Sequence, residues 1–151
     1  GYGDYRRIDF NLLPNIYIAY DPHRAEFSGT YHRKLRALFE QERPDIISAM
    51  SEFADIARQG YEALMAGKPE KLPALINANF DLRDRIFNVS PENKRMVEYA
   101  RKTGASAKFA GSGGAIVGSY ECEQMYERLK VSLAEIGCEV IKPDIAGTLT
   151  P

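Results

Sequence analysis

Between Ala107 and Val117, two short apolar runs flank four small residues, three of which are glycine. Glycine adopts positive φ angles and has no Cβ, so such a loop turns backbone N–H groups outward and lets a ligand approach closely. Successive outward N–H groups form a concavity that binds anions, usually phosphate. A tight turn that binds nothing has the same composition. The segment predicts two strands joined by a Gly loop, whose candidate phosphate or nucleotide contacts are Gly111, Ser112, Gly113 and Gly114.

Two familiar phosphate-binding motifs do not fit this loop. Neither Gly-Lys-Ser nor Gly-Lys-Thr occurs after residue 111, as a Walker P-loop requires. The residues after the loop are typical of a strand, whereas P-loop and Rossmann motifs lead into a helix. The sequence therefore excludes both motifs.

Apolar spacing along the chain predicts the element order β-α-α-α-α-β-β-α-β. Strands are expected at 15–20, on both sides of the Gly loop, and at 138–141. Capping residues and helical spacing predict helices at 28–41, 44–67, 68–87, 90–104 and about 125–136. Four strands in two pairs suit an α+β, ferredoxin-like fold. We expect a four-stranded antiparallel sheet covered by helices, with an added helical hairpin.

Composition narrows the class of partner. The 20 basic and 21 acidic residues give a net charge of −1, so no global field attracts nucleic acid or a membrane surface. No apolar run approaches the roughly 18 residues of a transmembrane helix. Cys122 and Cys138 make neither a disulfide framework nor a metal site, and His32 has no partner at ligand spacing. We expect a cytoplasmic domain with no metal site, no nucleic-acid partner and no membrane partner.

The blocks around these features resemble the GHMP sugar kinases. Residues 108–115 are similar to the family's third motif, a Gly-rich loop near the C-terminus that helps close the nucleotide-phosphate site. Residues 79–83, with Phe87 beyond them, resemble the glucuronokinase branch of the family. The other blocks similar to that branch are 1–3, 12–14, 28–29 with His32, and 46–50. All of them keep the family's order and approximate spacing.

The resemblance implies that residues 1–146 are the C-terminal half of a two-domain kinase, followed by a tail at 147–151. The family's triphosphate-wrapping motif and the half that carries its catalytic carboxylate have no counterpart in these 151 residues. We therefore expect no catalytic residue here, an inactive chain by itself, and an N-terminal kinase domain as its partner.

For the full-length protein, the resemblance implies phosphoryl transfer from ATP, with Mg²⁺, to the anomeric hydroxyl of a uronic acid such as glucuronate. A heptose phosphate or galactose is an alternative sugar substrate. A non-catalytic ferredoxin-like module that binds a small effector or a partner chain is the alternative from another functional class.

Two polar clusters have two interpretations each. Asn79, Asp81 and Arg83 are either a solvated helix face, with Asp81 paired to Arg85, or support for the Gly loop or contacts to the substrate. Arginine suits the second role because its planar fork binds two oxygens at once. The basic segment that contains Arg24, Ser28 and His32 is either a solvated helix start or the edge of a site for an acidic sugar.

Overall fold

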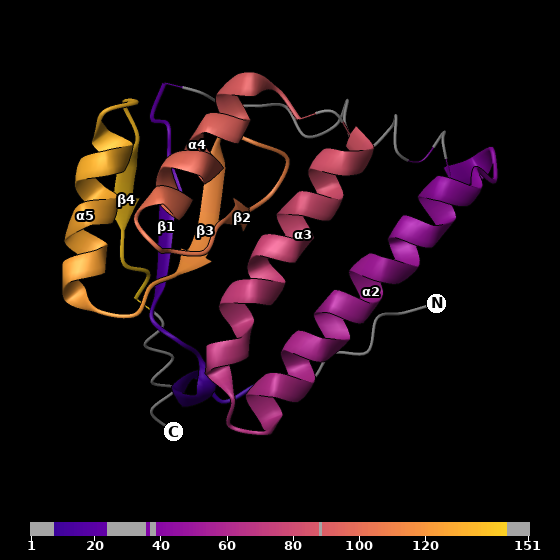
Figure 1. Ribbon diagram of the computed structural model, residues 1–151, viewed down its shortest axis with the longest axis horizontal. Helices are drawn as coiled ribbons and strands as arrows, with labels where there is room; N and C mark the ends of the chain where they lie inside the picture. The colour runs from indigo at the N-terminus through magenta and orange to yellow at the C-terminus, as the bar shows by residue number, and fades with distance from the viewer. Residues whose placement is uncertain (1–7, 24–35, 37–38, 88, 145–151) are drawn as a thin grey trace, which may run out of the picture.

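The sheet has four antiparallel strands, as expected, and the structure gives their order as β2-β3-β1-β4 (Figure 1). They are β1 (Ile16–Tyr20), β2 (Lys108–Phe109), β3 (Ala115–Ser119) and β4 (Glu139–Ile141). The structure is a computed structural model, and it describes residues 8–23, 36, 39–87 and 89–144. The long chain segment between β1 and β2 supplies helices to the fold, so the α+β class is confirmed.

Four helices with defined bounds accompany this sheet in the described residues: α2 (Pro44–Met65), α3 (Leu72–Phe87), α4 (Pro91–Lys102) and α5 (Glu123–Ala134). Short 3₁₀ turns, η1 (Phe10–Leu12) and η2 (Pro69–Lys71), precede β1 and α3. Figure 1 shows α4 and α5 against one face of the sheet, and α2 beside α3 as the expected hairpin. No helix in the described ranges has the length and apolar run needed to cross a membrane.

Local signals set most helix boundaries. The Ser90 hydroxyl accepts a hydrogen bond from the Asn93 backbone N–H at 3.4 Å and caps α4, with Pro91 in the first turn. Glycines at positive φ follow three helices: Gly67 (65°), Gly104 (93°) and Gly137 (77°). The expected helix from residue 68 instead begins with η2, so α3 starts at Leu72.

The segment before α2 and the buried stripe of α2 differ from a simple reading of the apolar spacing. Most of the helix expected at 28–41 lies outside the described residues. Within that range, the described residues 36, 39 and 40 are helical. Ile47 shares the helical spacing of the apolar residues of α2, yet it is 44% exposed. Since α2 packs beside α3, one stripe of α2 is buried, through Ile46, Ala49, Ala63 and Leu64.

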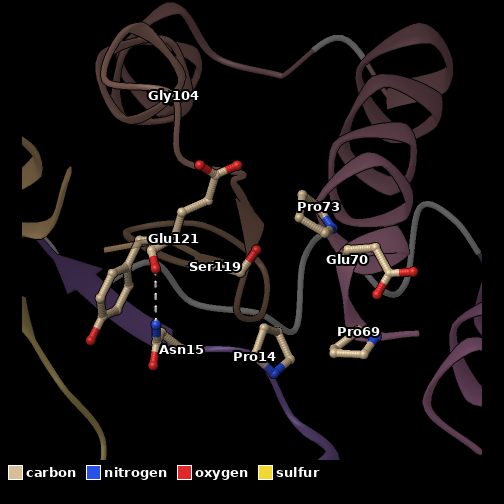
Figure 2. A pocket seen from close by; sticks show the side chains of 9 residues that line it. Pro14, Asn15, Pro69, Glu70, Pro73, Gly104, Ser119 and Glu121 are labelled. Carbon is tan, nitrogen blue, oxygen red and sulfur yellow. Dashed lines mark hydrogen bonds between the residues drawn. The ribbon is translucent and has the colours of Figure 1, made fainter. Parts of the chain in front are cut away.

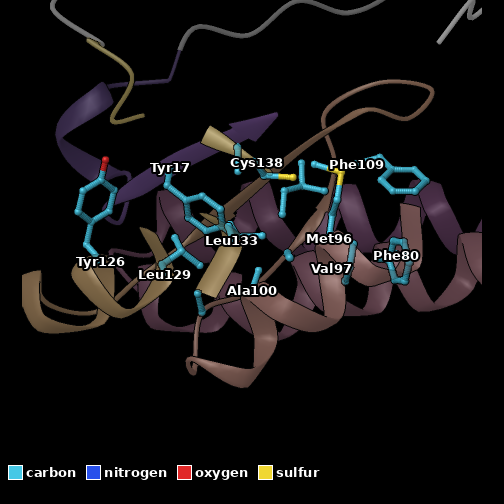
Figure 3. Close-up of a cluster of buried hydrophobic side chains, with 14 of the residues drawn as sticks. Tyr17, Phe80, Met96, Val97, Ala100, Phe109, Tyr126, Leu129, Leu133 and Cys138 are labelled. Carbon is cyan, nitrogen blue, oxygen red and sulfur yellow. The ribbon is translucent and has the colours of Figure 1, made fainter. Parts of the chain in front are cut away.

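The core lies between the sheet and the helices (Figure 3). Strand alternation turns Tyr17 and Ala19 of β1 and Ile116 of β3 toward it, and each of these side chains is fully buried. From the helices come Met96, Val97, Ala100, Leu129 and Leu133. Phe80 of α3 and Phe109 of β2 meet edge to face, with ring centroids 5.3 Å apart. This aromatic pair joins α3 to the edge strand that leads into the Gly loop.

Candidate functional site

The Gly loop is a closed hairpin between β2 and β3. The Ala110 N–H donates to the Ala115 carbonyl at 3.0 Å, and the Asp21 N–H donates to the Gly114 carbonyl at 3.1 Å. Gly113 and Gly114 have φ angles of 153° and 73°, which side-chain-bearing residues rarely adopt. The loop therefore needs glycine at both positions, as its sequence predicts.

Arg83 of α3 reaches across to this loop. Its Nη1 donates to the Gly111 carbonyl at 2.8 Å, and its Nη2 lies 3.5 Å from the Ser112 carbonyl oxygen. The guanidinium carbon lies 4.9 Å from the centroid of the Phe109 ring, a cation–π contact. Two roles were expected for Arg83: holding the Gly loop or contacting a substrate. These contacts favour the first.

Arg101, at the end of α4, holds the strand that leads into the loop. Its Nη1 binds Asp81 Oδ1 at 2.7 Å, and its Nη2 donates to the carbonyls of Asn77 at 2.9 Å and Ala107 at 3.3 Å. The Ala107 N–H in turn donates to Asn77 Oδ1 at 3.0 Å. Both backbone groups of Ala107 are therefore bound by side chains, the N–H by Asn77 of α3 and the carbonyl by Arg101 of α4.

Asn93 fixes the far end of the loop. Its side chain is buried in the first turn of α4, and its Oδ1 accepts the Gly114 N–H at 3.0 Å. Its Nδ2 lies 3.1 Å from the Ser90 hydroxyl that caps the helix. One amide therefore couples the start of α4 to the Gly loop.

Lys108 adds a second cation beside Arg83. Its Nζ donates to the Phe109 carbonyl at 3.0 Å. Burial, and then the positive charge of Arg83, lower the pKa of Lys108 below its ordinary value. Burial and the nearby charge both disfavour the protonated form of Lys108. An anion that binds beside it would stabilise that charged form.

The other site residues predicted from the sequence do not bind the Gly loop directly or lie outside the described residues. Asn79 is half-buried on α3 and makes none of the hydrogen bonds to the loop. Asp81 binds Arg101, so its expected pairing with Arg85 is wrong, and Arg85 instead binds Glu52 at 2.6 Å. Arg24, Ser28 and His32 lie outside the described residues.

Sequence reasoning missed Arg101 and Asn93. Arg101 lies in the last turn of α4, where a basic residue is common because it interacts favourably with the helix dipole. Its position in the sequence therefore indicated no further role. Asn93, three residues after the capping serine, has no pattern of its own. Only the packing of α4 behind the loop brings these two side chains to backbone groups of residues 107 and 114.

A cavity of about 280 Å³ lies at the opposite end of β3 from the Gly loop (Figure 2). Its lining includes Pro14, Pro73, Ser119 and Glu121, and the Asn15 amide donates to the Glu121 carbonyl at its edge. Four residue steps along β3, roughly 13 Å, separate this cavity from the loop. Across the described residues, no group of three or more His, Cys, Asp or Glu side chains could hold a metal ion.

The sequence of this chain is similar to those of two known proteins. No family model matches the chain. Over 120 residues it is 42% identical to the probable glucuronokinase 2 of Arabidopsis thaliana and 39% identical to glucuronokinase 1 of the same plant. The match covers 78% of this chain but only 32% and 33% of those proteins, so the chain spans about a third of their length.

Solved structures share the fold at low sequence identity. The match to mevalonate kinase from L. major has a TM-score of 0.74 at 20% identity, over 85% of this chain and 43% of that one. The Lin0012 protein of Listeria innocua gives 0.75 at 14% identity, over 85% and 38%. Phosphomevalonate kinase of Streptococcus pneumoniae gives 0.64 at 19%, over 86% and 41%. In each case the fold covers less than half of the larger protein.

Proposed function

We propose that this chain, which is a glucuronokinase-like C-terminal domain of the GHMP kinase type, forms the Gly-loop side of the phosphate site in a sugar kinase. In the full-length protein the reaction would transfer a phosphoryl group from ATP to the anomeric hydroxyl of a uronic acid such as glucuronate. The observation that carries this proposal is a loop held at both ends and along its length by Arg83, Arg101, Asn77 and Asn93.

Phosphoryl transfer depends mainly on positioning and on charge stabilisation. A glycine loop fixed by side chains from two helices supplies oriented backbone donors without rearrangement during the reaction. The similarity to glucuronokinases supports the choice of sugar, and the third of their length that is matched supports a partner domain in the same protein. That domain would bring the catalytic carboxylate, the ligands of Mg²⁺ and most contacts to ATP.

A sugar panel tests the function. ADP release by the full-length protein would be measured with glucuronate, galacturonate, galactose, glucose and a heptose phosphate, each with ATP and Mg²⁺. We expect sugar-dependent turnover that is highest with glucuronate. A preference for a neutral sugar would remove the uronic acid from the proposal, and no turnover with any sugar would contradict the kinase assignment.

A further inference from the structure

We propose that Arg83 is a positioning residue: it turns two peptide groups of the Gly loop so that the N–H groups of Ser112 and Gly113 face outward as a paired donor for a phosphate group. The inference rests on the proposed function and names the donors and the side chain that aims them. The phosphate could belong to a nucleotide or to a phosphorylated sugar, because both present the same oxygens.

Peptide geometry gives the direction of the two donors. In a trans peptide the C=O of one residue and the N–H of the next lie in one plane and point in opposite directions. The carbonyls of Gly111 and Ser112 both point to Arg83. The N–H groups of Ser112 and Gly113 therefore both point away from Arg83, on the same side of the loop.

Both donors are available in the part of the chain that the structure describes. Neither the Ser112 N–H nor the Gly113 N–H donates to a protein acceptor there, and Ser112 and Gly113 are half-buried. The Gly114 N–H is instead occupied by Asn93 Oδ1. Two adjacent outward N–H groups form the kind of concavity that binds an anion.

Arginine suits this task better than lysine would. Its planar fork reaches two oxygens at once, whereas an ammonium group is a point charge. The ring of Phe109 lies 4.9 Å from the guanidinium carbon, and Phe80 packs edge to face with that ring. A cation bound to the carbonyl also polarises the peptide group, so its N–H becomes a stronger donor.

An NMR titration of this chain tests the direction of the donors. Inorganic phosphate, ADP and glucose 1-phosphate would each be added to the ¹⁵N-labelled protein while backbone amide and arginine side-chain signals are followed. We expect the largest shifts at the Ser112 and Gly113 amides, and the stronger of the two organic ligands identifies the source of the phosphate. If the Arg83 side-chain signals shift most, the guanidinium itself binds the anion and the proposal is wrong.

Two variants separate positioning from charge. Arg83→Gln removes the cation, and Arg83→Lys keeps it but loses the fork. If Arg83 positions the peptides, both variants weaken phosphate binding at these amides by about tenfold or more, which is roughly 1.4 kcal/mol. Normal binding in Arg83→Lys with loss in Arg83→Gln would mean simple charge attraction and would overturn the inference, as would normal binding in both.

Two readouts keep this inference distinct from the kinase proposal. The amide signals of β1 and α5 show whether each variant is folded, and the wild-type titration decides the issue even if a variant is not. In the full-length enzyme, Arg83→Lys should change KM for glucuronate and for galactose by the same factor, because the sugar carboxylate is not its partner. A selective rise for glucuronate would contradict positioning, whereas amide binding without sugar kinase activity would remove only the function.

Discussion

Gly113 shows how a single residue links conformation to activity. Its φ angle of 153° lies in a region that β-branched residues avoid, and it sits between the two helix-anchored ends of the Gly loop. If the full-length protein is the proposed kinase, Gly113→Val should reduce its turnover by about 10²–10³-fold, the usual loss when an oriented donor is removed from a site of developing charge.

Turnover and melting temperature should be measured on the same preparation of Gly113→Val. Gly60→Ala is the matched control, because an alanine Cβ there would lie at an ordinary 3.5 Å from Leu72, and Gly60 belongs to α2 and not to the loop. If Gly113→Val melts much earlier and keeps normal turnover per folded molecule, the glycine serves the turn alone.

Asn93 is the buried polar residue that closes the other end of the loop. Asn93→Ala leaves the buried Gly114 N–H without its acceptor, so the free energy of unfolding should fall by about 1–3 kcal/mol. Asn79→Ala, a change of the same side chain away from the loop's hydrogen bonds, should have a smaller effect. Urea unfolding of both variants measures the difference, and equal effects would show that the Asn93 contact contributes no more than an average helix position.

At the level of elements, the contact between β3 and the segment that precedes β2 depends on one missing side chain. A Cβ added to Gly118 would lie 1.7 Å from the Ser106 carbonyl oxygen and 2.7 Å from the Tyr17 ring. The Tyr17 hydroxyl donates to that same carbonyl at 2.8 Å. β1, β3 and residue 106 therefore approach one another more closely than any residue but glycine allows at this position.

Gly118→Ala should consequently destabilise the protein by several kcal/mol, because the close atoms belong to the backbone and to a buried ring that cannot move away. Gly111→Ala is the stability control, since nothing lies within 4 Å of the Cβ position there. Thermal unfolding followed by circular dichroism compares the two variants. A Gly118→Ala protein as stable as Gly111→Ala would show that this close approach does not exist in solution.

At the scale of the whole molecule, Tyr17 makes the free energy of unfolding depend on pH. Burial raises the pKa of this fully buried tyrosine well above the ordinary 10.0. The unfolded chain therefore loses this proton at a lower pH than the folded protein does. The stability that Tyr17 contributes is present below pH 10 and is lost as the pH rises above 10, by up to about 1.4 kcal/mol per pH unit.

Urea unfolding at pH 8, 9, 10 and 11 tests this dependence, with Tyr17→Phe as the control that cannot ionise. We expect the wild type to lose stability more steeply than Tyr17→Phe above pH 10, and the two to run parallel below it. Parallel curves over the whole range would mean that Tyr17 ionises as easily in the folded protein as in the unfolded chain.

The proposed division of the kinase site can be tested on this chain by itself. If the kinase site is divided between this chain and a second domain, the 151-residue chain alone should release no ADP in a sugar-dependent way, although the full-length protein does. Binding of ATP by the chain alone would be weak, near a Kd of about 1 mM, which corresponds to roughly −4 kcal/mol. Steady sugar-dependent ADP release by the purified chain would contradict the divided site.

Local sequence determined most of the elements. Periods of two and of 3.6 residues, the Ser90 cap and the glycines after the helices are signals read over a few residues, so strands, helices and the Gly loop could be predicted from them. Four predicted strands in two pairs, with helices between them, then favoured an antiparallel sheet. Helical spacing did not show which apolar residues of α2 are buried: Ile46 is buried and Ile47 is exposed, because α2 packs beside α3 along one stripe only.

Tertiary structure decided how the loop is held. The partners of the loop lie at long separations in the chain: Arg83 is 28 residues from Gly111, and Asn93 is 21 residues from Gly114. No local pattern encodes such pairs, because they depend on how α3 and α4 are placed beside the loop. The sequence by itself identified glycines that permit an outward-facing loop, and the packing of two helices determined which way its peptide groups point.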